Sequence, residues 1–131
     1  MITIDLANMK QSFLLVEQDL EELAPNLDPK QLYKATFVCE EILTNLARHA
    51  NFENRTPDVS LNLDTIEQEA LLLTFKDNAK SFNLLNYPDP KIGGDLEETE
   101  LGGLGIYLTK QYSKNIQYCY ENDYNILKVL L

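Results

Sequence analysis

The segment 40–51 carries polar side chains that recur every four residues: Glu41, Asn45 and His49. In a helix, residues four apart lie on one face, so a carboxylate, an amide and the only histidine of the chain would form one polar stripe. A plain surface face would carry mixed charges, and this composition therefore suggests a site. The alternative that this stretch leaves open is a solvated face with a chance asparagine and histidine.

All five glycines of the chain lie within residues 93–105, and three of them form Gly102-Gly103-Leu104-Gly105 directly before a predicted helix. Glycine lets the backbone approach a ligand closely, and a helix N-terminus offers free N–H groups to phosphate. The segment lacks the Gly-Lys-Ser/Thr of a Walker A motif, and it does not follow a first strand as a dinucleotide fingerprint would. It is therefore either a phosphate loop of another kind or a flexible connection.

Asp77 stands where an apolar run ends. An aspartate in this position is most often a turn residue. At the lip of a sheet its carboxylate can also accept a hydrogen bond from an exocyclic amine, such as that of adenine. Together with the glycine segment and the polar stripe, it would complete a nucleotide site.

Composition limits the classes of partner. The net charge of −10 over 131 residues argues against nucleic-acid binding, which needs a basic surface, and disfavours an anionic membrane. No apolar run approaches the ~20 residues of a membrane span, and no secretory signal is visible. Cys39 and Cys119 lie in apolar settings without a CxxC motif, so we expect two buried, reduced thiols in a cytoplasmic protein.

Local patterns predict the elements that must position these residues. Alternation over residues 1–6 predicts a strand, and the spacing of apolar residues after Asn8 predicts an amphipathic helix that ends at Pro25. Asp28-Pro29 is an N-cap followed by proline, and Gln31 completes a capping box; they begin a long helix that runs to about residue 50. The apolar stripe of that helix comprises Leu32, Ala35, Ile42 and Leu46.

The second half of the chain reads mainly as strands. Alternating or apolar runs predict strands at 59–64, 70–75, 116–120 and 124–131, with a tight turn over 64–69 and a hairpin at Asn122-Asp123. A short helix is predicted at 106–113, and residues 80–101 read as a long loop. Strands that follow a run of helices favour an α+β two-layer sandwich, formed by a single domain over residues 1–131.

In order and spacing, three segments resemble the N, G1 and G2 boxes of the GHKL ATPases, the superfamily of gyrase and the histidine kinases. They are Glu41-x-x-x-Asn45-x-x-x-His49-Ala50, residues 77–83 and residues 101–108. The resemblance covers essentially the whole chain and implies a Bergerat-type ATP-binding fold, a mixed, mostly antiparallel sheet with helices on one face. The compact length and the segment from Pro88-Asp89-Pro90 to Gly102-Gly103-Leu104-Gly105 most resemble the anti-sigma-factor serine kinases. No phosphoacceptor helix hairpin precedes the domain, which disfavours a complete sensor histidine kinase.

The resemblance assigns roles to individual residues. Glu41 would be the general base, and Asn45 would hold Mg²⁺ on the triphosphate of ATP. Asp77 would accept the adenine amino group, and His49 would give structural support. Residues 84–101 would form a lid over the phosphates. The remaining cofactor-binding residues that it implies are Ala79, Phe82, Gly102, Gly103, Leu104 and Gly105.

Three positions depart from the family pattern. Ala79 replaces a usual glycine, and its methyl group would crowd the nucleotide or stiffen the loop. Ser81 replaces a frequent proline, which would loosen the turn. The last strand lacks a threonine common in the family, so one polar contact near adenine would change. We therefore expect weakened ATP affinity, without loss of the glutamate or the asparagine.

Two classes of function follow. The first is an ATP-dependent protein serine/threonine kinase that sequesters a sigma factor and phosphorylates an anti-sigma antagonist of the STAS type. The second is a non-catalytic module that uses ATP as a switch or not at all, and a histidine-kinase ATPase fragment is a further alternative. The resemblance also suggests a homodimer.

Overall fold

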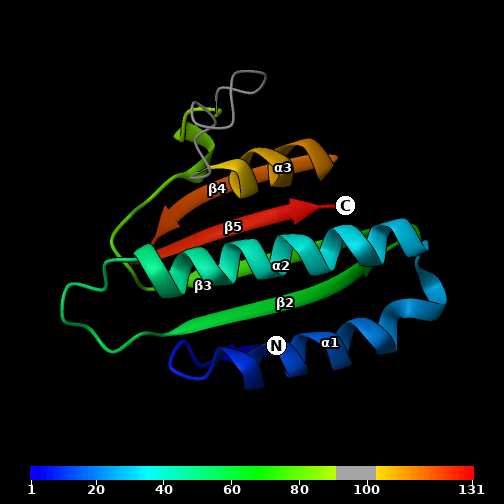
Figure 1. Ribbon diagram of the computed structural model, residues 1–131, viewed down its shortest axis with the longest axis horizontal. Helices are drawn as coiled ribbons and strands as arrows, with labels where there is room; N and C mark the ends of the chain where they lie inside the picture. Colours follow the sequence, from blue (N-terminus) through cyan, green and yellow to red (C-terminus); the bar gives the residue numbers. More distant parts are fainter. Residues whose placement is uncertain (91–102) are drawn as a thin grey trace, which may run out of the picture.

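The computed structural model describes residues 1–90 and 103–131, and these form a five-stranded sheet covered by helices on one face (Figure 1). The α+β sandwich predicted from the order of elements is confirmed. The elements, in chain order, are β1 (Ile2–Ile4), α1 (Met9–Leu23), α2 (Pro29–His49), β2 (Val59–Ile66), β3 (Ala70–Asp77), α3 (Leu104–Tyr112), β4 (Asn115–Glu121) and β5 (Tyr124–Leu130), with short 3₁₀ turns at Ala24–Asn26 and Leu84–Asn86.

The strands lie in the order β1-β2-β3-β5-β4, and every pairing is antiparallel. Tight turns close two hairpins: residues 67–69 join β2 to β3, and Asn122-Asp123 joins β4 to β5. Glu67, Gln68, Asn122 and Asp123 have φ between 53° and 66°, the left-handed conformation that turns of the I′ type require. The hairpin predicted at Asn122-Asp123 is therefore confirmed, whereas the first turn is shorter than predicted because β2 continues to Ile66.

Strand alternation determines which side chains face the helices. Along β3 the buried residues are Leu71, Leu73, Phe75 and finally Asp77. Asp77 thus continues the apolar face and brings its carboxylate under the helices at the end of the strand. The register pairs Asp77 directly with Asn125 of β5, which is also buried.

Helix α2 crosses this face of the sheet (Figure 1). Its start is fixed by the predicted capping box, in which the Asp28 carboxylate accepts from the N–H of Lys30 and the Gln31 side chain accepts from the N–H of Asp28. Of the predicted apolar stripe, Leu32 and Leu46 are only partly buried. The residues of α2 that are fully buried are Ala35, Val38, Cys39, Ile42 and Leu43.

One expectation about the cysteines was wrong. Cys39 is buried, and burial raises the pKa of its thiol to about 12, so it is an inert core residue. Cys119 is exposed, because alternation along β4 turns Ile116 and Tyr118 toward the helices and leaves Cys119 on the open face of the sheet. Both thiols are free.

Residues 91–102 lie outside the described part of the chain. They include Gly93, Gly94 and Gly102, as well as most of the segment 84–101 that was expected to form a lid. Before this gap, Lys110 of α3 holds the chain by donating to the carbonyl of Tyr87 at 3.1 Å and pairing with Asp89 at 3.6 Å. No helix among the described residues is long and apolar enough to cross a membrane.

Candidate functional site

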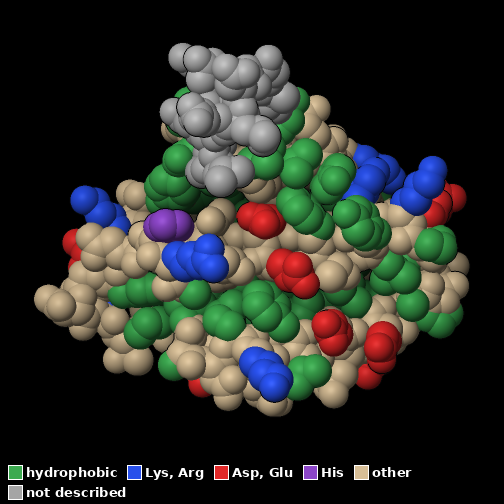
Figure 2. All heavy atoms as spheres, in the orientation of Figure 1, with side chains coloured by type: hydrophobic (Ala, Val, Ile, Leu, Met, Phe, Trp, Pro, Cys, Tyr) green, Lys and Arg blue, Asp and Glu red, His purple; other side chains and the backbone are tan. Residues whose placement is uncertain are grey.

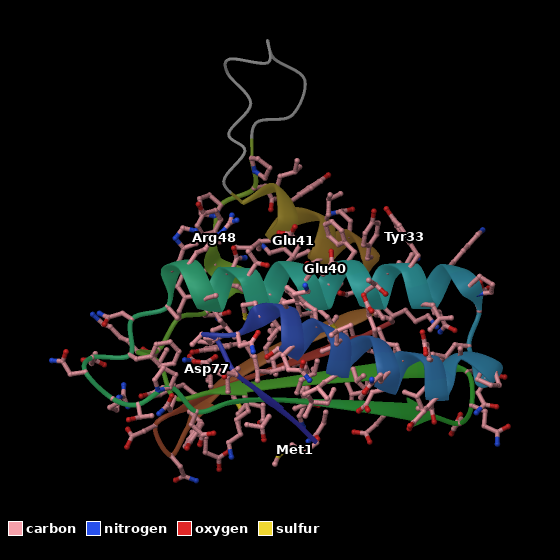
Figure 3. All side chains as sticks on the ribbon, turned by 60° about the horizontal axis from the view of Figure 1, so that its bottom comes forward. Met1, Tyr33, Glu40, Glu41, Arg48 and Asp77 are labelled. Carbon is pink, nitrogen blue, oxygen red and sulfur yellow. The ribbon has the colours of Figure 1, made fainter. Side chains whose placement is uncertain are left out.

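A cleft of about 970 Å³ lies between the C-terminal half of α2, the adjoining ends of β3 and β5, and the start of α3. A volume of this size accommodates a nucleotide. In Figure 3, Glu41 and Arg48 project from α2 toward the α3 side, whereas Asp77 lies at the sheet. The predicted site residues that line the cleft are Glu41, Asn45, His49, Asp77, Ala79, Phe82, Gly103 and Gly105.

The structure confirms that the polar stripe of α2 faces one space. Glu41 and Asn45 are half-buried in the cleft, and His49 lies at its exposed end. Figure 2 shows the single histidine at the molecular surface beside a basic side chain. The exposure of His49 fits a peripheral position better than one at the centre of the site.

Asp77 is held as a hydrogen-bond acceptor. Its Oδ1 accepts from the backbone N–H of Ala79 at 3.0 Å and from the side-chain amide of Asn125 at 2.9 Å. Among residues 1–90 and 103–131, no hydrogen bond uses Oδ2, which leaves this atom for a ligand in the cleft. Burial raises the pKa of Asp77, and the two hydrogen bonds counteract part of that rise.

Asn125 was not among the predicted site residues, yet it connects most of the polar groups at this end of the sheet. Its amide N–H₂ also donates to the carbonyls of Ala79 at 3.1 Å and Lys80 at 3.2 Å. Its Oδ1 accepts from the N–H of Phe82 at 3.0 Å and from the hydroxyl of Tyr118 at 2.5 Å. The one feature of the sequence that pointed to this residue was the last strand, which lacks a threonine common in the family.

Ala79 does not strain the loop. Its φ is not positive, so the backbone at this position adopts a conformation open to any residue. The side chain is buried, and both peptide groups next to it are hydrogen-bonded, to Asp77 and to Asn125. The loop therefore accommodates an alanine at this position without cost to its geometry.

Both described glycines of the glycine segment make close contacts that a Cβ would disturb. Gly103 is the N-cap of α3 with φ of 88°, and a Cβ there would lie 2.5 Å from the ring of Tyr87. A Cβ on Gly105 would overlap the carboxylate of Glu41. No side chain among the described residues caps α3, so its first N–H groups remain available to an anion. Helix α3 begins at Leu104, two residues earlier than predicted.

A scan against protein-family models matches residues 4–130 to the histidine kinase-like ATPase domain. The chain belongs to this family. A search of curated proteins finds no match. Among solved structures, the histidine kinase domain of the blue-light activated histidine kinase EL346 from Erythrobacter litoralis is similar, with a TM-score of 0.55 and 17% identity. That match covers 78% of this chain and 44% of the other, and at this identity it shows the shared fold alone.

As a histidine kinase-like ATPase domain, the chain is an ATP-binding module, and two basic residues that sequence reasoning missed also line its cleft: Arg48 and Lys80. In a chain with a net charge of −10, these cations are the local charges that can offset a triphosphate. In the sequence, Arg48 directly precedes His49, a residue of the polar stripe, and Lys80 directly follows Ala79. Both are therefore adjacent to residues that the sequence analysis had already identified.

The donor set of this ATPase domain fits Mg²⁺ only together with the nucleotide. Within the described ranges, no three His, Cys, Asp or Glu side chains come together as a metal cluster. Asn45 lines the cleft and would provide one oxygen ligand, and phosphate oxygens would provide the others, which is the usual manner in which proteins bind Mg²⁺.

Proposed function

We propose that this ATPase domain is a protein serine/threonine kinase that binds a sigma factor and phosphorylates a STAS-type antagonist of that anti-sigma activity. The observation that supports it is the contact between Glu41 and Gly105, which places a carboxylate beside the free N–H groups at the start of α3. A base close to a phosphate-binding helix end is what phosphoryl transfer to a hydroxyl requires.

In the proposed reaction, the hydroxyl oxygen of a serine or threonine attacks the γ-phosphorus of ATP. A new O–P bond forms, the bond between the γ-phosphorus and the bridging oxygen breaks, and ADP leaves. Glu41 accepts the proton of the hydroxyl group. The N–H groups at the start of α3, with Arg48 and Lys80, stabilise the charge of the phosphates. Mg²⁺, when bound at Asn45, would neutralise the β- and γ-phosphates.

Recognition of adenine is assigned to Asp77. Its Oδ2 would accept from the exocyclic amine, while Oδ1 is held by the protein. The acidic surface suits partners with basic patches, and the family resemblance suggests that the chain acts as a homodimer in the cytoplasm.

The likeness to a histidine kinase domain suggests a second candidate function, that of an ATPase module that phosphorylates histidine. A phosphotransfer assay with radiolabelled ATP, Mg²⁺ and a candidate STAS protein distinguishes the two. Label on the antagonist that is stable to acid supports the serine/threonine kinase, because phosphohistidine is acid-labile. Acid-labile label contradicts it, and ATP binding without any transfer would indicate the non-catalytic switch.

A further inference from the structure

The side chain of Asn125 is fixed in one orientation. Its oxygen accepts from two donors, the N–H of Phe82 and the hydroxyl of Tyr118, and its N–H₂ group faces three acceptors. Rotation of the amide by half a turn would set its oxygen against the Asp77 carboxylate and the two carbonyls. Every member of this network is thus satisfied in only one arrangement.

This orientation also fixes Asp77. Two donors from different parts of the fold converge on Oδ1: a strand side chain on one side and the loop N–H of Ala79 on the other. Because both donors lie on the same oxygen, the plane of the carboxylate cannot turn, and Oδ2 is kept as a bare acceptor. A base with a carbonyl group opposite this atom would place two acceptors together, whereas an exocyclic amine would donate to it.

We propose that Asn125 is a positioning residue for base recognition, which holds Asp77 so that the cleft selects 6-amino purines over 6-oxo purines. The proposal rests on ATP binding by this site. It also gives the altered last strand a role, because a side chain of this strand, which lacks the family threonine, bonds the aspartate directly. Tyr118 of β4 acts through Asn125 and lines the same cleft.

Protonation links this geometry to pH. Burial favours the neutral form of Asp77, and the hydrogen bond from Asn125 favours the charged form. If that hydrogen bond is removed, the pKa of Asp77 rises further. A protonated Asp77 can donate a hydrogen bond, so discrimination against a 6-oxo base would weaken as the pH falls.

The test compares ATP with inosine triphosphate, which carries oxygen in place of the 6-amino group, across pH 5.5 to 8.5. We expect the parent to bind ATP more tightly, by roughly 10- to 100-fold. Asn125→Leu should reduce that ratio by about tenfold or more and should move the fall of ATP affinity to higher pH. Asn125→Thr can still donate a hydrogen bond to Asp77. Its affinity ratio and its pH dependence should therefore lie between those of the parent and those of Asn125→Leu.

Two tyrosine variants provide a matched control. Tyr118→Phe removes a donor to Asn125 and should change the ATP to inosine triphosphate ratio in the same direction by a smaller factor. Tyr124→Phe removes a hydroxyl that donates to Asp58 at the same distance of 2.5 Å, outside the cleft, and should leave the ratio unchanged. Neither variant depends on Asn125→Leu being folded.

A nucleotide-free measurement separates this proposal from the proposed function. Carboxyl NMR of the parent and Asn125→Thr, supported by Asn125→Leu where it folds, follows the titration of Asp77 directly. Equal midpoints in all variants, with an unchanged nucleotide ratio, would overturn the role of Asn125. If the parent binds no purine nucleotide, the proposed function and base selection both fail, and the titration still decides whether Asn125 positions Asp77.

Discussion

Replacement of Asp77 by asparagine changes a single side-chain atom, and its effects on ATP affinity and on the free energy of unfolding can be measured separately. Oδ1 receives two donors, from Ala79 and Asn125, so in Asp77→Asn the side-chain oxygen must stay in this place and the new N–H₂ group takes the position of Oδ2. Both protein hydrogen bonds are therefore kept. Only the group presented to the ligand changes, from an acceptor to a donor.

The loss of affinity follows from the groups that would meet. A hydrogen bond to a charged acceptor contributes about 1.5–3 kcal/mol, and an amine left facing another donor costs a further 1–3 kcal/mol or so. The sum of about 2.5 kcal/mol or more corresponds to a loss of ATP affinity of roughly 60-fold or more. Stability should change in the opposite direction, because a buried charge is removed.

The sign of the stability change depends on pH. Burial raises the pKa of Asp77 above its ordinary value of 3.8, so the ionised group opposes folding above the raised pKa. Asp77→Asn should therefore have a higher free energy of unfolding than the parent at neutral pH. This gain should disappear as the pH falls through the raised pKa toward the ordinary value, where the parent carboxyl is neutral in both states.

Calorimetric titration with ATP and urea unfolding at several pH values measure both effects. Asp58→Asn is the matched control, since it makes the same chemical change at an exposed aspartate outside the cleft. Undiminished ATP affinity in Asp77→Asn would refute the assignment of Asp77 to the base. A stability gain that is equal at all pH values would refute the account of its buried charge.

Three further variants test the other assignments. Asn45→Ala should weaken Mg-nucleotide binding and leave the fold intact, because Asn45 lies off the buried face of α2. Equal affinity for ATP with Mg²⁺ in parent and variant would contradict a metal role. Glu41→Ala should keep ATP binding and lose roughly 10²- to 10⁴-fold in phosphotransfer, and transfer at the parent rate would show that Glu41 is not the base. Gly105→Ala should fold, since the three atoms nearest to the added Cβ all belong to the Glu41 side chain, which can move, but should lose transfer by displacing that carboxylate. The double variant Glu41→Ala/Gly105→Ala should then transfer phosphate no more slowly than Glu41→Ala alone. Additive losses would show that Gly105 acts independently of Glu41.

Local sequence patterns were sufficient to predict most of the elements. The capping box at Asp28 and the Asn122-Asp123 turn are local interactions over a few residues, and both formed as predicted. The polar stripe of α2 was equally predictable from the sequence, because a helix of known period places Glu41 and Asn45 on one face regardless of its surroundings. The spacing of the boxes identified the family, and the family model confirms it.

The contacts between elements follow from tertiary packing. The sheet order places β5 between β3 and β4, and this order pairs Asp77 with Asn125, 48 residues away. The contact of Glu41 with Gly105, the cleft positions of Arg48 and Lys80, and the exposure of Cys119 likewise depend on packing. Periodicity and capping act between neighbours in the chain, whereas strand order and register come from burial shared by distant segments, and no local pattern records that.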